Sequence, residues 1–129
     1  MSDKGFAYIP EECEVFDCPV HFALHGCRMN NNQIGMDFIV HSQFNEIAEA
    51  NKIVIIYPQV GDVQVTPTYK TGGCWDLVGY SDWDSTQFMW YMTKNGEQPK
   101  FLYNLYQSLV QGKVEFTPIS LTEFSEEAI

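Results

Sequence analysis

Apolar and polar positions along the first half of the chain follow a strand pattern, then a helix pattern, then a strand pattern again. Gly5–Pro10 (GFAYIP) alternates and stops at a proline, and Pro19–Leu24 (PVHFAL) is a second short apolar run, so both are predicted strands. In Gly35–Asn51 the apolar residues recur at helical spacing, which predicts one amphipathic helix. Lys52–Tyr57 (KIVIIY) is almost wholly apolar and β-branched, as is typical of a strand buried on both faces. This order predicts a βαβ unit with a parallel pair of strands.

The second half of the chain is more polar, and its pattern is less regular. Gln59–Gly73 is predicted to be a long polar loop because it contains Thr-Pro and Gly-Gly turn signals. Thr86–Thr93 is long enough for one or two helical turns, and Glu97–Gln111 has apolar residues at helical spacing up to a glycine that should end the helix. The acidic stretch 119–129 is expected to be a mobile tail, which leaves 1–118 as the folded part.

Composition and charge exclude several classes of partner. The 129 residues include 7 basic and 17 acidic side chains, for a net charge of -10. Nucleic-acid phosphates and anionic membrane surfaces both require clustered Lys and Arg, so neither partner is expected. No apolar run approaches the ~18 residues of a membrane span, and the first residues lack the long apolar core of a signal peptide. The length fits one ordinary domain or part of a larger one.

Four cysteines carry information through their placement. Cys13 and Cys18 bracket a short acidic loop, whereas Cys27 and Cys74 each follow a glycine. A zinc site would need two close pairs at C-x2-C spacing, so two disulfides, Cys13–Cys18 and Cys27–Cys74, are the preferred interpretation. Free buried thiols and a metal site remain the alternatives. Disulfides would indicate an extracellular or lumenal compartment, and because no signal peptide is visible, we expect that Met1 is not the native start of the gene product.

The chain offers no complete set of catalytic side chains. None of its seven serines stands in the G-x-S-x-G frame of an α/β-hydrolase nucleophile. Cys27 lies close to His25, but neighbours along a turn rarely align for proton transfer. His21 on its strand and His41 on its helix are interpreted as structural or solvent-facing residues. No metal ion or cofactor is therefore expected.

The turn after the second predicted strand points instead to chemistry by the backbone. In α/β-hydrolases one donor of the oxyanion hole comes from a glycine-containing loop after a sheet strand. In LHGC, Gly26 would let the backbone turn sharply and aim the Cys27 N–H at a developing oxyanion, a contact worth ~3 kcal/mol. An ordinary strand-end turn is the alternative interpretation.

Several stretches taken together resemble one family. GFAYIP, CPVHFALHGCR, FNEIAEANKIVIIYPQ, GGCWDLVGY and YMTKNGEQPKFL follow one another between Gly5 and Leu109. They resemble the C-terminal half of the extracellular polyhydroxybutyrate depolymerases, which are circularly permuted secreted esterases. The resemblance implies a partial α/β-hydrolase-like sheet, namely a βαβ unit with an edge strand and packing helices, incomplete as an independent domain. It also implies that the serine elbow, aspartate and histidine of the active site precede this region.

The resemblance assigns roles to particular residues. Cys27 would supply the second N–H of the oxyanion hole and would be bridged to Cys74. Trp75 corresponds to a tryptophan that contacts substrate in the family. His25 and Gly26 would support the oxyanion loop, while the catalytic histidine lies elsewhere.

The function implied is that of the oxyanion-hole and substrate-binding half of a secreted serine esterase. Such a protein would hydrolyse a short-chain hydroxyalkanoate polyester or related ester, and this chain would be inactive without an N-terminal half. Leu77 and Val78 stand where the family usually has aromatic residues, and the loss of that surface argues against polyester binding and leaves a smaller ester as an alternative substrate. The alternatives are a decayed paralogue and a non-catalytic module that binds through Trp75, Trp83 and Trp90.

Overall fold

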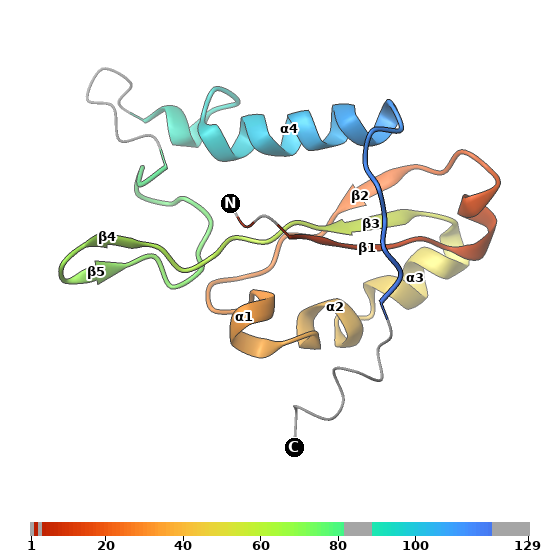
Figure 1. The fold of residues 1–129 in the computed structure, drawn as a ribbon, viewed down its shortest axis with the longest axis horizontal. Coiled ribbons are helices and arrows are strands. Elements are labelled where there is room, and N and C mark those ends of the chain that lie inside the picture. Colours follow the sequence, from red (N-terminus) through yellow and green to blue (C-terminus); the bar gives the residue numbers. More distant parts are fainter. Residues whose placement is uncertain (1, 3, 82–88, 120–129) are drawn as a thin grey trace.

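A small mixed sheet forms the centre of the computed structural model, which describes residues 2, 4–81 and 89–119. The three strands are β1 (Phe6–Tyr8), β2 (Val20–Phe22) and β3 (Val54–Tyr57), in the order β1-β3-β2. β3 pairs in parallel with β2 and antiparallel with β1 (Figure 1). The predicted βαβ unit is therefore confirmed. The strands are shorter than predicted, in part because Pro10 and Pro19 cannot donate to a ladder.

Three short helices connect β2 to β3. They are α1 (Asn31–Ile34), α2 (Asp37–His41) and α3 (Phe44–Asn51). The sequence pattern indicated a single helix from residue 35 to 51, and that prediction is wrong.

The break between α2 and α3 has a local cause. Gln43 adopts a left-handed backbone conformation, with φ 66°, which no helix can continue through. The side chain of Asn45 then donates from Nδ2 to the carbonyl of Ile39 at 2.9 Å, which satisfies a carbonyl at the end of α2. Apolar residues occur on both sides of the break, so their pattern alone did not reveal it.

The apolar core lies between the sheet and the helices that connect β2 to β3. Tyr57 and Ala48 are fully buried there, and the Tyr57 hydroxyl donates to Asn45 Oδ1 at 2.7 Å. The buried members of this cluster are Ala23, Met36, Ile39, Ala48, Ile55 and Tyr57. β3 supplies two of them and, as predicted, is the most buried strand. The core therefore fixes the C-terminal end of β2, where the candidate site begins.

A two-stranded hairpin occupies the segment predicted to be a loop. β4 (Gln64–Thr66) and β5 (Tyr69–Lys70) pair antiparallel, and Gln64 Nε2 donates to the carbonyl of Tyr69 at 3.0 Å. The loop prediction is wrong here because the Thr-Pro signal marks the turn of a hairpin rather than a continuous loop. The hairpin brings the chain back toward the end of β2.

The last helix agrees with its prediction. α4 (Glu97–Val110) ends one residue before the predicted boundary, and Gly112 follows it with φ 65°. Figure 1 shows α4 on the opposite side of the sheet from α2 and α3. A 3-10 turn, η2 (Trp90–Met92), precedes it, and another, η1 (Glu11–Glu14), lies between β1 and β2. No helix in the described ranges is both long and apolar enough to span a bilayer.

Two predictions fall on residues that the structure does not describe. The helical turns predicted at 86–93 are tested only from residue 89 onward, where η2 forms. Trp83 and the acidic stretch from residue 120 onward lie outside the described residues.

Candidate functional site

Both predicted disulfides are present. Cys13 is bonded to Cys18 and Cys27 is bonded to Cys74. No free cysteine remains, and the described residues contain no group of three or more His, Cys, Asp or Glu side chains that could hold a metal ion. The alternatives of free thiols and a cysteine metal site are therefore ruled out for these four cysteines.

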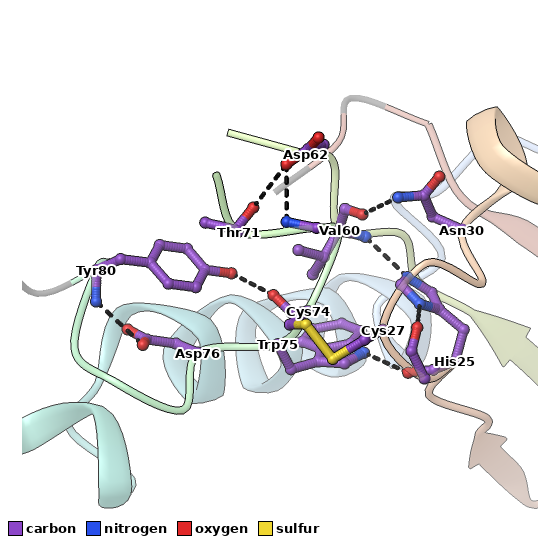
Figure 2. The surroundings of a disulfide bond; sticks show 12 residues. His25, Cys27, Asn30, Val60, Asp62, Thr71, Cys74, Trp75, Asp76 and Tyr80 are labelled. Atoms are coloured by element: carbon purple, nitrogen blue, oxygen red, sulfur yellow. Dashed lines mark hydrogen bonds between the residues drawn. A yellow bond between two sulfur atoms is a disulfide. The ribbon is translucent and has the colours of Figure 1, made fainter. Parts of the chain in front are cut away.

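The Cys27–Cys74 disulfide is one of three bonds that link the loop after β2 to the loop after the hairpin. On one side of it, the Arg28 N–H donates to the carbonyl of Gly72 at 2.8 Å. On the other side, the Trp75 indole N–H donates to the carbonyl of His25 at 3.0 Å (Figure 2). We call residues 25–28 the oxyanion loop, after the role predicted for it from the sequence, and residues 72–75 the partner loop. The disulfide and the two hydrogen bonds lie within four residues of each loop and hold the two loops in a fixed register.

His25 is a structural residue whose two ring nitrogens are both occupied. Its side chain is buried, and its Nε2 accepts a hydrogen bond from the Val60 N–H at 3.1 Å. Because an amide N–H can only donate, Nε2 carries no proton and the tautomer is protonated at Nδ1, which donates to the Gly26 carbonyl at 2.7 Å. The ring also packs against Phe38 and Trp75. His25 is therefore available neither as a general base nor as a metal ligand.

Buried amide side chains extend this support to the segment after β3. Asn30 Nδ2 donates to the carbonyl of Val60 at 2.9 Å, and Gln59 Oε1 accepts the N–H of Asn31 at 2.8 Å. A β-carbon on Gly73 would lie 2.3 Å from Asn30 Nδ2, so this close approach requires glycine there. Nothing in the sequence pattern indicates Asn30 or Gln59, because a single Asn or Gln carries no spacing signal.

The Cys27 N–H is free to bind a ligand. Cys27 is exposed, and its N–H meets no hydrogen-bond acceptor among the described residues. The Met29 N–H donates to the carbonyl of Gly26 at 3.2 Å, which closes a turn around Cys27. A backbone donor that is held rigidly and left unpaired is what stabilisation of an oxyanion requires.

Trp75 is half-buried beside the oxyanion loop. Its ring centroid lies 5.7 Å from that of His25, and its only polar group is already hydrogen-bonded to the His25 carbonyl. Trp75 can therefore offer a ligand only the apolar surface of its ring. Contact between Trp75 and a substrate stays a prediction.

The Asp76 carboxylate organises the end of the partner loop. Burial acts to raise the pKa of this carboxyl group, but hydrogen bonds from the hydroxyl and the N–H of Ser81 and from other backbone N–H groups outweigh it, so the pKa is lowered. The backbone donors to the two carboxylate oxygens are Val78, Gly79, Tyr80 and Ser81. The ionised form of Asp76 therefore holds the turn that follows Trp75.

Gln98 connects this turn to α4. The side chain is buried, and its Oε1 accepts the Asp76 N–H at 2.7 Å while its Nε2 donates to the Tyr80 hydroxyl at 2.9 Å. The Tyr80 hydroxyl in turn donates to the carbonyl of Cys74 at 2.6 Å (Figure 2). The first turn of α4 is thus linked to the Cys27–Cys74 disulfide through two side chains. Nothing in the sequence pattern singled out Gln98, because its spacing matches an ordinary helix face.

The two remaining histidines lie away from these loops. His21 is exposed on β2 and packs near Phe44, and His41 is exposed at the last residue of α2. Of the residues predicted for the site, the structure brings together Cys27, Cys74, Trp75, His25 and Gly26.

Comparison with known proteins relates the chain to one group of enzymes. No protein-family model matches it. It is 31% identical over 121 residues, 92% of its length, to the poly(3-hydroxybutyrate) depolymerase of Delftia acidovorans, and covers 22% of that protein. It is 35% identical over 89 residues, 62% of its length, to the polyhydroxybutyrate depolymerase of Talaromyces funiculosus, and covers 26% of that protein. The chain therefore spans about a quarter of the length of these relatives.

Two solved structures agree with the sequence comparison. One is a PHB depolymerase in complex with an R3HB trimer, which matches 62% of this chain and 28% of that chain at 31% identity, with a TM-score of 0.50. The other is the PHB depolymerase from Penicillium funiculosum, which matches 67% of this chain and 30% of that chain at 29% identity, with a TM-score of 0.51.

Proposed function

Because the chain is homologous over most of its length to a segment of polyhydroxybutyrate depolymerases, we propose that it forms one side of the active site of a serine ester hydrolase. In this proposal the Cys27 N–H donates a hydrogen bond to the oxyanion, and Trp75 provides an apolar wall for the substrate. The substrate is a short-chain hydroxyalkanoate polyester or a related ester. The serine, aspartate and histidine come from the part of the enzyme that corresponds to the N-terminal half.

The unpaired Cys27 N–H is the observation that carries this proposal. An oxyanion donor has to be in place before the reaction, since a donor that must first be ordered loses part of its effect. The disulfide and the two hydrogen bonds that flank Cys27 provide that rigidity. Both ring nitrogens of His25 are occupied, so in this proposal the proton transfers are carried out by a histidine outside this chain.

Two further features belong to the proposal. We infer that the 129-residue chain does not hydrolyse esters by itself, because no serine stands in the G-x-S-x-G frame. We also infer that the protein is secreted, because structural disulfides form and persist mainly in oxidising compartments.

A hybrid enzyme tests the proposal. In the hybrid depolymerase, this chain replaces the 121-residue segment that it matches in the Delftia acidovorans enzyme, so the relative supplies the remaining parts of the active site. The expected result is hydrolysis of 3-hydroxybutyrate oligomers by the hybrid depolymerase and none by the isolated chain. A folded hybrid depolymerase without turnover would contradict the proposed role, and turnover by the isolated chain would contradict the division between two halves.

A pair of variants isolates the contribution of the N–H. Cys27→Ala with Cys74→Ala removes the disulfide but keeps the N–H at residue 27. Cys27→Pro with Cys74→Ala removes both, since proline has no N–H. Loss of an oxyanion donor lowers kcat by about 100- to 1000-fold, so the proline variant should be slower than the alanine variant by that factor. Equal kcat values for two hybrid variants with the same circular dichroism spectrum would exclude the Cys27 N–H as a donor.

A further inference from the structure

Arg28 is the only arginine in the chain, and its guanidinium forms no ion pair with any residue that the structure describes. The side chain is exposed, and the ion pairs of the described residues join Lys52 to Glu12 and Lys100 to Glu97. The rest of the chain is strongly acidic, with a net charge of -10, so its overall field repels anions. A free guanidinium next to the oxyanion loop is therefore a local exception to the charge of the whole protein.

The backbone of Arg28 is held in an unfavourable conformation. Its φ is 59°, in the left-handed region, which costs a residue with a β-carbon roughly 1–2 kcal/mol. The hydrogen bond from its N–H to the Gly72 carbonyl helps to maintain that conformation. Strain of this kind is concentrated at active sites and ligand-binding positions. Glycine would fit this backbone without strain, so the presence of arginine points to a use for its side chain.

Arg28 and Trp75 lie at opposite ends of the set of three bonds that contains Cys27. Along the two loops, the His25–Trp75 bond comes first, the Cys27–Cys74 disulfide second and the Arg28–Gly72 bond third. The Arg28 side chain lies beside Gly72, where Cγ and Nε are each 3.9 Å from the position that a β-carbon would take. An ester held at the Cys27 N–H would thus have an aromatic surface on one side and a guanidinium on the other.

We infer that Arg28 is a specificity residue that binds the terminal carboxylate of a hydroxyalkanoate oligomer whose ester group lies at the Cys27 N–H. A guanidinium matches a carboxylate with two parallel hydrogen bonds, which no other side chain in this region offers. Each hydrolysed ester bond leaves a carboxylate on one new chain end and a hydroxyl on the other, so every linear short oligomer carries one terminal carboxylate that Arg28 can bind. The inference rests on the proposed function and adds a preference for oligomers with a free acid end.

The experiment measures binding to the full 129-residue chain by NMR. The two probes are the linear 3-hydroxybutyrate trimer with a free carboxylate and the same trimer as its methyl ester. The amide signal of Cys27 and the indole signal of Trp75 report occupancy. We expect the free acid to bind about three- to tenfold more tightly than the methyl ester at low salt, and the difference to shrink as salt is added.

Three variants decide the role of Arg28. Arg28→Gln should abolish the preference for the free acid, Arg28→Lys should retain part of it, and Lys113→Gln, which removes an exposed charge beyond α4, should leave it unchanged. Equal affinity of the wild-type chain for both probes, or a preference that survives Arg28→Gln, would overturn the inference and leave the proposed function intact. If neither probe shifts the Cys27 or Trp75 signals, the inference is overturned, and turnover by the hybrid depolymerase then decides the proposed function separately.

Discussion

Replacement of His25 by alanine tests whether this residue supports the oxyanion loop or takes part in proton transfer. In the native protein the imidazole accepts the Val60 N–H and donates to the Gly26 carbonyl. Alanine removes both hydrogen bonds and the ring that packs between Phe38 and Trp75. The backbone of the oxyanion loop then loses its link to the segment after β3.

The cost of this change follows from burial. Val60 is almost fully buried, so its N–H would be left without a partner and without water, at about 1–3 kcal/mol. The lost packing of the buried ring adds an amount of the order of 2 kcal/mol. The total is about 3–5 kcal/mol. His21→Ala is the matched control, because His21 is exposed on β2 and should cost less than ~0.5 kcal/mol.

Two assays measure the effect. Denaturant unfolding of the hybrid depolymerase gives the free energy of unfolding for each variant, and amide exchange of Val60 in the 129-residue chain reports the local loss. Val60 should exchange at least about tenfold faster in His25→Ala than in His21→Ala. A His25→Ala enzyme with normal stability but without turnover would refute the structural role and make His25 a catalytic base.

Three further predictions concern the supports of the two loops. Loss of the Cys27–Cys74 disulfide should lower the free energy of unfolding by about 4 kcal/mol, and loss of Cys13–Cys18 should lower it by about 2 kcal/mol, because the bonds close loops of 47 and 5 residues. Equal decreases in denaturant unfolding of the hybrid depolymerase would refute this. Because the pKa of Asp76 is lowered, the stability that its ionised form gives is complete above the unfolded-state pKa and is lost as pH falls through the lowered value. Amide protection of residues 78–81 should therefore fall in that acid range, and Asp76→Asn should remove this pH dependence. Gln98→Met should leave the Asp76 N–H and the Tyr80 hydroxyl without their partner and speed amide exchange in residues 74–81, whereas exchange in β1 should not change.

The elements that could be predicted from the sequence are those fixed by apolar spacing. β3 is predictable because its short run is almost wholly apolar and β-branched, and α4 because its apolar residues keep helical spacing over 14 residues. The break at Gln43 and the β4–β5 hairpin were missed because they depend on a single left-handed residue and on a two-residue turn, neither of which alters the apolar period. Local backbone geometry of this kind overrides the periodicity of apolar residues where side-chain hydrogen bonds stabilise it.

The candidate site was predictable only as far as its residues had unusual types or neighbours. The two disulfides and the HGC turn drew attention because cysteine and glycine are informative in themselves. The buried partners of those residues are Asn30, Gln59 and Gln98, common polar side chains whose role appears only when distant segments meet. The role of His25 also needed the structure, because the partner of its Nε2 is the N–H of Val60, 35 residues away.

The central claim is that the Cys27 N–H binds the oxyanion, and its proton can be observed directly. The hybrid depolymerase, labelled with nitrogen-15 at cysteine, is treated with an alkyl phosphonate that forms a tetrahedral adduct on the catalytic serine. The account predicts a downfield shift of the Cys27 amide proton when the adduct forms, because the N–H then donates to a charged oxygen. A complete adduct that leaves this signal unchanged would contradict it.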